Sequence, residues 1–150
     1  MAMIFRSALR ADVPAILELL DDDEISRSRV VPEASDADFW KAFEAIDADP
    51  RNELIVADDE GEIVGTCQLT FTPSLSRRAT ERMTIEAVRV RADRRSAGVG
   101  RAMMLWALDI ARERGCGLVQ LTTDKRRTAA QRFYASLGFT ATHEGMKLQL

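Results

Sequence analysis

The stretch VRVRADRRSAGVGRAMM, residues 88–104, combines several local patterns within a short segment. At its start valine alternates with arginine, which is the pattern of a β-strand, and at its end an apolar run begins, as at the start of a helix. Between the two lie further arginines and a pair of glycines, Gly98 and Gly100. The stretch therefore predicts a strand that ends near Arg91, a tight loop, and a helix that begins immediately after it.

A loop of this kind is suited to hold an anion. The first turn of a helix has backbone N–H groups without intrahelical partners and carries a partial positive charge, so its donors converge on an anion in the preceding loop. Glycine has no Cβ, so a phosphate can approach the backbone at Gly98 and Gly100, and arginine can bind two phosphate oxygens at once. We predict a phosphate-binding loop; a plain glycine turn with solvated arginines is the alternative.

Two common phosphate motifs do not fit these residues. A P-loop requires lysine and then serine or threonine after its last glycine, whereas Arg101 and Ala102 follow Gly100. A dinucleotide-binding fingerprint requires a third glycine or alanine where Met103 stands, together with a parallel sheet. The loop is therefore expected to bind a different phosphate compound.

On both sides of this unit the sequence changes repeatedly between helical and strand-like periods. Asp12 is positioned to cap the first helix, with Pro14 in its first turn, and Asp59-Glu60-Gly61 is a hairpin turn. We expect strands over residues 3–9, 83–91 and 117–124, hairpins over 52–73 and 139–150, and helices over 10–23, 35–50, 99–114 and 127–137.

This order of elements predicts one domain, residues 1–150, of the mixed α/β (α+β) class. Its sheet is expected to be largely antiparallel and flanked by helices, with one strand–helix–strand crossover in the middle. Hydrophobic residues make up 46% and charged residues 30% of the chain, which is typical of globular proteins. Because no apolar run approaches the roughly 18 residues of a membrane span, and an acid and a proline stand too early for a secretion signal, we expect a cytoplasmic protein without membrane contact.

Charge is unevenly distributed, although the net charge is only −3. Acids gather at residues 18–24 and arginines at residues 89–101, which indicates either two sites or two solvated faces. The small net charge, and the lack of aromatic residues among the arginines, argue against nucleic-acid binding. His143, Cys67 and Cys116 have no metal-ligand spacing, so we expect no metal site and two reduced thiols that serve in packing.

Two segments of the chain resemble one known family. VRVRADRRSAGVGRAMMLWALDIARERG, residues 88–115, is similar to the acetyl-CoA-binding segment of the GNAT superfamily of N-acetyltransferases. RRTAAQRFYASLGF, residues 126–139, resembles the later helical motif of that family, and the order of elements also matches. The resemblance covers essentially the whole chain, with one departure: Arg127 stands where many relatives have asparagine.

The resemblance implies that acetyl-CoA is the co-substrate. In this family the strand before the loop pairs its main chain with the pantetheine arm, which points here to Val88, Arg89 and Val90. The loop and the first helical turn hold the pyrophosphate with backbone N–H groups. That assigns the pyrophosphate to Arg95, Ser96, Ala97, Gly98, Val99, Gly100 and Arg101.

The resemblance also implies catalytic roles. The N–H groups around Val88 are expected to stabilise the thioester oxygen, and Tyr134 is expected to donate a hydrogen bond to the leaving sulfur. Glu86 alternates with Val88 and Val90 along the strand, so we expect its side chain on the same face as theirs, as a candidate general base. The alternatives are a core tyrosine that packs beside Phe133 and a surface glutamate.

The predicted function is transfer of an acetyl group from acetyl-CoA to a primary amine of a small molecule or protein, by direct attack on the thioester. The alternative is a catalytically silent CoA-binding or regulatory module of the same fold. The acids at residues 21–24 would favour a cationic amine or be a solvated helix end. Phe39, Trp40 and Phe71 line the acceptor site or pack in the core. A closing hairpin with an apolar edge would support a homodimer.

Overall fold

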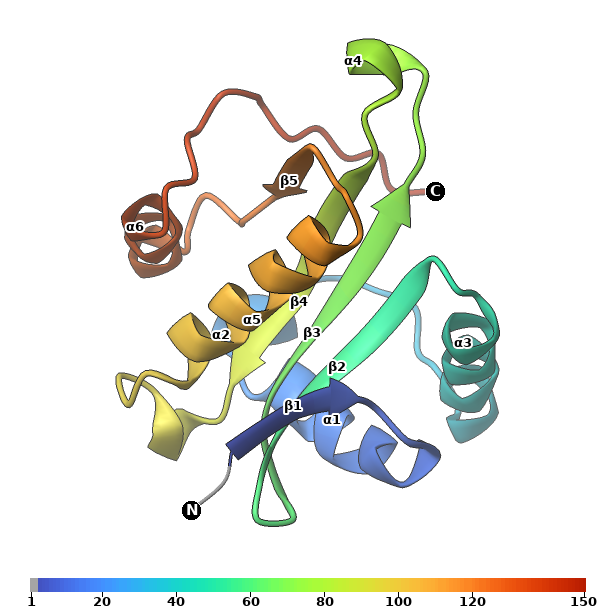
Figure 1. Ribbon diagram of the computed structural model, residues 1–150. Helices are drawn as coiled ribbons and strands as arrows, with labels where there is room; N and C mark the ends of the chain where they lie inside the picture. Colours follow the sequence, from blue (N-terminus) through green and yellow to red (C-terminus); the bar gives the residue numbers. More distant parts are fainter. Residues whose placement is uncertain (1–2) are drawn as a thin grey trace.

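The computed structural model describes residues 3–150, which are arranged around one five-stranded sheet (Figure 1). The strands lie side by side in the order of the sequence, and neighbouring strands are antiparallel except for the last pair, which is parallel. This confirms the predicted mixed, largely antiparallel sheet. The strands are β1 (Met3–Ser7), β2 (Asn52–Asp59), β3 (Glu62–Thr72), β4 (Arg82–Val90) and β5 (Leu118–Leu121).

Helices cover both faces of the sheet. One face packs against α5, and the opposite face packs against α1 and α3 (Figure 1). Two short turns of 3-10 helix, η1 (Arg10–Asp12) and η2 (Ala92–Arg94), precede α1 and the loop before α5. The helices are α1 (Val13–Asp21), α2 (Glu24–Arg27), α3 (Asp36–Ala48), α4 (Ser76–Ala79), α5 (Val99–Glu113) and α6 (Thr128–Ser136). None of them is long and apolar enough to cross a membrane.

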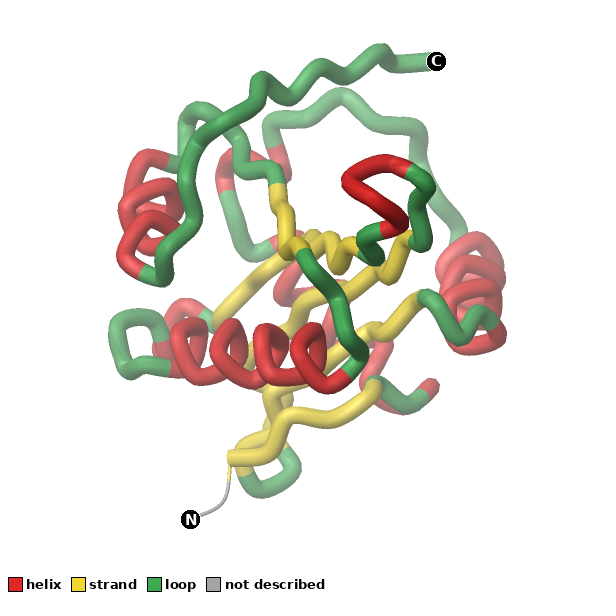
Figure 2. The backbone as a smooth tube through the Cα atoms, turned by 45° about the horizontal axis from the view of Figure 1, so that its top comes forward, coloured by secondary structure: helices red, strands yellow, loops and turns green. Residues whose placement is uncertain are grey.

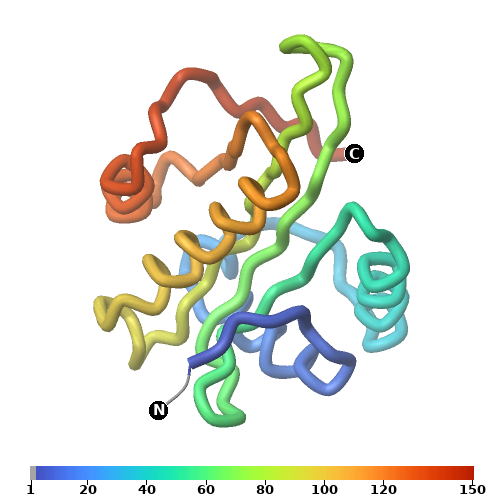
Figure 3. Tube along the Cα trace, viewed as in Figure 1, coloured from blue at the N-terminus to red at the C-terminus, as the bar shows by residue number. Residues whose placement is uncertain are grey.

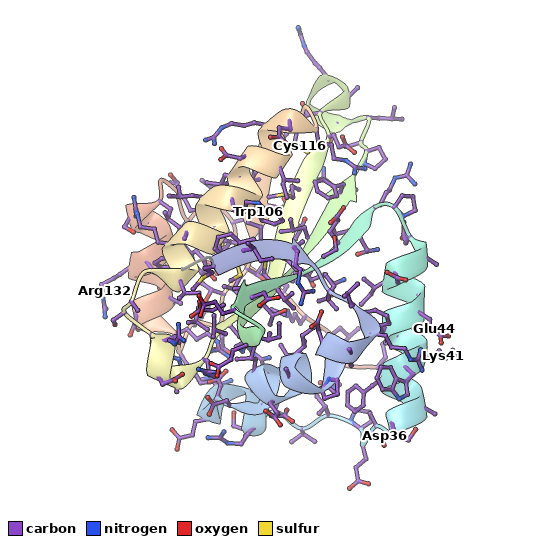
Figure 4. All side chains as sticks on the ribbon, turned by 60° about the horizontal axis from the view of Figure 1, so that its bottom comes forward. Asp36, Lys41, Glu44, Trp106, Cys116 and Arg132 are labelled. Carbon is purple, nitrogen blue, oxygen red and sulfur yellow. The ribbon has the colours of Figure 1, made fainter. Side chains whose placement is uncertain are left out.

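The main core lies between α5 and the sheet. Buried residues of α5 recur every three or four positions, so that one stripe of the helix meets β3 and β4. Trp106, on the flank of this stripe, packs against Phe5 of β1, with tilted rings whose centroids lie 5.8 Å apart. Figure 4 labels Trp106 on α5. The crossover from β4 through α5 to β5 is therefore fixed by apolar packing on the central strands, as the sequence pattern predicts.

Two local predictions at the turns have different outcomes. The β2–β3 turn is confirmed, because Glu60 and Gly61 both have positive φ angles, of 53° and 94°. The predicted cap of the first helix is confirmed in its position, since Asp12 is the N-cap residue of α1, but not in its hydrogen bond. Asp12 precedes α1, but its side chain makes no capping hydrogen bond; its carboxylate accepts from the Leu9 N–H at 2.7 Å and from Arg6 at 2.7 and 3.1 Å.

The predicted closing hairpin over residues 139–150 is also wrong, because these residues form no strand. They run as a loop from α6 back across the end of the sheet (Figures 2 and 3). Met146, Leu148 and Leu150 alternate as in a strand, yet they are 92%, 86% and 111% exposed. Alternation specifies a strand only where one face has a surface to bury against, and a two-stranded hairpin alone is at best marginally stable.

Candidate active site

The parallel strands β4 and β5 pair over only part of their length. The paired residues run from Arg82 opposite Leu118 to Ile85 opposite Leu121, where β5 ends. From Glu86 to Val90, β4 continues and pairs only with β3 on its other side. Within the described residues no strand pairs with this edge of β4, so its main chain can accept an extended ligand as an additional strand.

A β-bulge interrupts β4 at the start of this free edge. Glu86 lies opposite Gln68 and Arg89 opposite Thr66, so two residues of β4, Ala87 and Val88, face the single residue Cys67 between them. Ala87 has a φ of 53°, in the left-handed region that residues with a Cβ rarely adopt. In such a bulge the extra residue is left out of the hydrogen-bond ladder, so main-chain N–H groups become available at Ala87 and Val88.

The bulge corrects the predicted orientation of Glu86. Strict alternation would put Glu86 on the face of Val88 and Val90, but one extra residue reverses the alternation. Val88 and Val90 pack against the core under α5, whereas Glu86 is exposed. Because Gln68 and Thr66 are two residues apart on one strand, their partners Glu86 and Arg89 share the opposite face, on which α1 and α3 pack.

The loop before α5, where the sequence predicts a phosphate site, contains one left-handed glycine. Gly98 precedes α5 with a φ of +87°, so it adopts the left-handed conformation that glycine alone adopts without strain. The side chains of residues 95–98 are exposed, while Val99 is buried and anchors the start of the helix. Gly100 differs from Gly98: a Cβ there would lie 3.5 Å from Val90 and 3.7 Å from Phe133, which are ordinary van der Waals distances, so packing of α5 does not require glycine at this position.

The arginines of the opening stretch divide into two groups. Arg91 and Arg94 form ion pairs with carboxylates next to the β2–β3 turn, Glu62 and Asp59, at 3.2 and 2.6 Å. These two arginines therefore fix the loop to the sheet. Arg101 and Arg95 are exposed, and the Arg95 side chain donates to the Val90 and Asp22 carbonyl oxygens.

Tyr134 lies on α6 and is half-buried against the core. Its ring centroid is 5.3 Å from that of Phe133 and 5.9 Å from that of Phe139, so aromatic packing fixes the orientation of the ring. Burial raises the pKa of the Tyr134 hydroxyl, and the positive charges of Arg89 and Arg127 act in the opposite direction. The hydroxyl is thus held protonated, as a hydrogen-bond donor must be.

Arg89 and Arg127 meet at a carboxylate that sequence reasoning did not place in the site. Arg127 forms a short ion pair with Asp23, and the Arg89 Nη2 lies 3.6 Å from the same oxygen. The Ser26 hydroxyl donates to Asp23 at 2.9 Å and accepts from Arg89 at 2.8 Å and from Arg127 at 3.3 Å. Burial alone would raise the pKa of Asp23, but Arg127 and Ser26 outweigh it and lower this pKa to about 2.

Further contacts bind the same part of the chain to the loop before α6. Residues 22–29, which include α2 and are called here the α2 segment, lie behind β4 in Figure 3. Arg29 lies 3.6 Å from Asp124, and Arg126 donates to the Ser28 hydroxyl at 3.1 Å. The pair Arg127–Asp23 joins residues 104 positions apart. In the sequence, the only signal for this contact is complementary charge, with acids at residues 21–24 and arginines at residues 126–127.

The remaining candidate residues lie elsewhere. Cys67 is buried in the core, and burial raises the pKa of its thiol to about 12, which makes it unreactive. Cys116 lies just beyond the end of α5 (Figure 4). Phe71 is buried in the core under α5, so it does not line an acceptor site on the opposite face, whereas Trp40 packs between α3 and the sheet. His143 is exposed in the C-terminal loop.

Comparisons with known proteins agree on one family. The family model described as "Acetyltransferase (GNAT) family" matches residues 13–139. Streptothricin acetyltransferase of Streptomyces lavendulae is 29% identical over 136 residues, which are 91% of this chain and 68% of that protein. Glucosamine 6-phosphate N-acetyltransferase of Trypanosoma brucei brucei is 34% identical over 90 residues, 60% of this chain and 59% of that protein.

A solved structure matches nearly the whole chain. The crystal structure of a transcriptional regulator from Bacillus halodurans C-125 superposes with a TM-score of 0.93 at 43% sequence identity. The match covers 99% of this chain and 100% of that chain. The described fold is therefore shared from end to end with a solved relative.

Proposed function

Because the chain belongs to the GNAT acetyltransferase family, we propose that it transfers the acetyl group of acetyl-CoA to a primary amine by direct attack of the amine on the thioester. The C–N bond forms as the C–S bond breaks, a base removes one proton from the amine, and the sulfur leaves as the CoA thiol. No covalent bond to the enzyme is required, which agrees with the buried, unreactive thiol of Cys67.

The cofactor is expected to follow the free edge of β4 to the start of α5. The pyrophosphate would accept hydrogen bonds from the backbone N–H groups of residues 95–101, where Gly98 permits the left-handed turn and side chains are exposed. The pantetheine arm would pair with the main chain of Val88, Arg89 and Val90, which has no strand partner on that side. These residues fit a long phosphorylated ligand with an amide-containing arm.

The β4 bulge is the observation that carries the proposal. Attack on a thioester places negative charge on the carbonyl oxygen, and a fixed N–H donor aimed at that oxygen lowers the barrier. The bulge frees main-chain N–H groups at Ala87 and Val88, at the start of the free edge of β4. The strained φ of Ala87 is the kind of outlier that functional sites retain.

Tyr134 and Glu86 would act as hydrogen-bond donor and general base. Tyr134 would donate its hydrogen bond to the sulfur as negative charge develops there, and its raised pKa keeps the hydroxyl protonated. Glu86 is exposed on the face of β4 opposite α5, so it can accept a proton from an amine on that face, directly or through water. The residues around this face of β4 would determine which amine is acetylated.

The experiment is an amine panel incubated with acetyl-CoA while free thiol is measured. Two relatives are named for amine substrates, streptothricin and glucosamine 6-phosphate, so the panel begins with aminoglycoside-like amines and amino sugars. Thiol release that requires an amine supports the proposal. CoA binding without thiol release from any amine contradicts it.

That negative result would favour the second candidate, a CoA-binding regulatory module. The specific observation behind this candidate is that the 43% identical relative is described as a transcriptional regulator. Retention on immobilised CoA, compared with salt-dependent retention on DNA, separates a CoA-binding module from a nucleic-acid binder.

A further inference from the structure

Arg89, Arg127 and Asp23 form a poorly hydrated cluster whose charges do not balance. Their side chains are only 14%, 19% and 13% exposed. Two guanidinium groups share one carboxylate, which leaves one net positive charge among these three residues. Burial and the charge of Arg127 both lower the pKa of Arg89, as expected for cations held close together.

The cluster also contains an unused hydrogen-bond donor. The Arg89 Nε is buried and has no hydrogen-bond partner among the described residues. Its Nη2 is already bound to Ser26, and its Nη1 donates to the Val88 carbonyl oxygen at 2.8 Å. A buried N–H without an acceptor costs free energy, which a ligand oxygen in that position would recover.

The face on which Arg89 lies determines which ligand can reach it. The bulge puts Arg89 on the same face of β4 as Glu86, opposite the face covered by α5. The phosphate loop begins the helix on the α5 side, so the cofactor phosphates already have their own site. The acceptor is expected to approach from the Glu86 side.

On the basis of the proposed function, we propose that Arg89 and Arg127 form a subsite for an anionic group, a phosphate or a carboxylate, on the amine that is acetylated. Asp23 holds the two arginines in place and shares their charge, so it competes with the ligand for them. The acids at residues 21–24 suggest a cationic acceptor, but Asp23 is already paired with Arg127, so the charge available to a ligand at this cluster is positive.

Anion binding is measured first, on protein saturated with CoA, so that the pyrophosphate site is filled. The probe is inorganic phosphate, and calorimetry measures its affinity for the protein. Arg89→Met should weaken phosphate binding about tenfold or more, since a charge-assisted hydrogen bond is lost. Asp23→Asn should tighten it, because the competing carboxylate is removed. Arg112→Met is the matched control: its partner is Asp109, both are exposed, and affinity should not change.

Acceptor preference is measured second, with amines that differ in one anionic group. The pairs are glucosamine with glucosamine 6-phosphate, and phenylalaninamide with phenylalanine, so phosphate and carboxylate are tested separately; 1,4-diaminobutane represents cationic acceptors. In at least one pair the anionic amine should have the lower KM, and Arg89→Met should remove that advantage, measured as the ratio of the KM values of the two amines within each protein.

Several results would overturn the subsite. These are equal phosphate affinity in wild type and a folded Arg89→Met protein, an equal loss of activity for the neutral and the anionic amine of each pair, or a preference for the diamine. Failure of the proposed function is distinguishable. If no amine releases thiol, phosphate binding that follows the Arg89 and Asp23 substitutions still supports an anion site, and phosphate binding that ignores them rejects it.

Discussion

At the scale of single residues, the Tyr134 hydroxyl gives the sharpest test of the chemistry. Tyr134→Phe keeps the ring and its contacts with Phe133 and Phe139, so melting temperature and CoA affinity should be nearly unchanged. The lost hydrogen bond strengthens only as the sulfur leaves, so kcat should fall by about a hundredfold. Steady-state kinetics with a good acceptor, beside calorimetry with CoA, measure both quantities.

The same variant has a signature in the pH profile. Burial raises the pKa of Tyr134, so in wild type the loss of activity on the alkaline side should occur above the usual range of a phenol. That loss should disappear in Tyr134→Phe. If Tyr134→Phe has a near-wild-type kcat and an unchanged alkaline limb, Tyr134 is a packed core residue without a catalytic role.

Gly98 can be tested against a glycine in the same conformation. Gly98→Ala should lower stability by about 1 kcal/mol, because the left-handed conformation disfavours a Cβ, and should also weaken CoA binding, because that Cβ lies where pyrophosphate approaches. Gly61→Ala is the control: its φ is +94°, and neither glycine has an atom within 4 Å of the added Cβ. Both variants should lose a similar amount of melting temperature, but only Gly98→Ala should bind CoA more weakly. Equal CoA affinities of the two variants would contradict the predicted pyrophosphate site.

At the scale of elements, the α2 segment is held by charge. The pKa of Asp23 falls from an ordinary 3.8 to about 2, so its ion pair contributes stability above pH 4 that is lost as pH falls toward 2. This corresponds to about 2 kcal/mol. Asp23→Asn should therefore be less stable than wild type at pH 7, and the difference should shrink between pH 4 and pH 2. Urea unfolding across this range measures it; a difference independent of pH would contradict the ion pair.

The elements also show where sequence reasoning succeeds and where it fails. Strands and helices with a clear apolar period, such as α5 and the β2–β3 hairpin, were predictable because burial on one face dictates the period. The orientation of Glu86 was not predictable, because the bulge depends on the left-handed conformation of Ala87, and an alanine side chain does not indicate that conformation. The loop and the start of α5 were predictable from local chemistry, but the Arg127–Asp23 contact depends on tertiary folding alone.

At the scale of the whole molecule, the C-terminal loop leaves apolar side chains in water. Met146, Leu148 and Leu150 alternate on an extended chain, and the neighbouring Val30 is 90% exposed, with Gln149 donating to its carbonyl oxygen. The hairpin edge on which the sequence-based homodimer prediction rests is absent, but we expect the exposed apolar side chains of this loop to support a homodimer. Sedimentation at micromolar concentration should show dimers in wild type and fewer after Met146→Ser and Leu148→Ser together. A monomer at all concentrations would refute this.

The bulge in β4 has a genetic consequence. Removing one codon from the middle of a sheet usually turns every later side chain to the wrong face. Here the in-frame deletion of Ala87 would leave Val88 opposite Cys67, with Glu86 and Arg89 still opposite Gln68 and Thr66. The shortened gene should therefore encode a protein that melts like wild type and lacks turnover, and a deletion scan should find β4 tolerant at the bulge and intolerant in the regular part of the strand, at Met83 and Thr84.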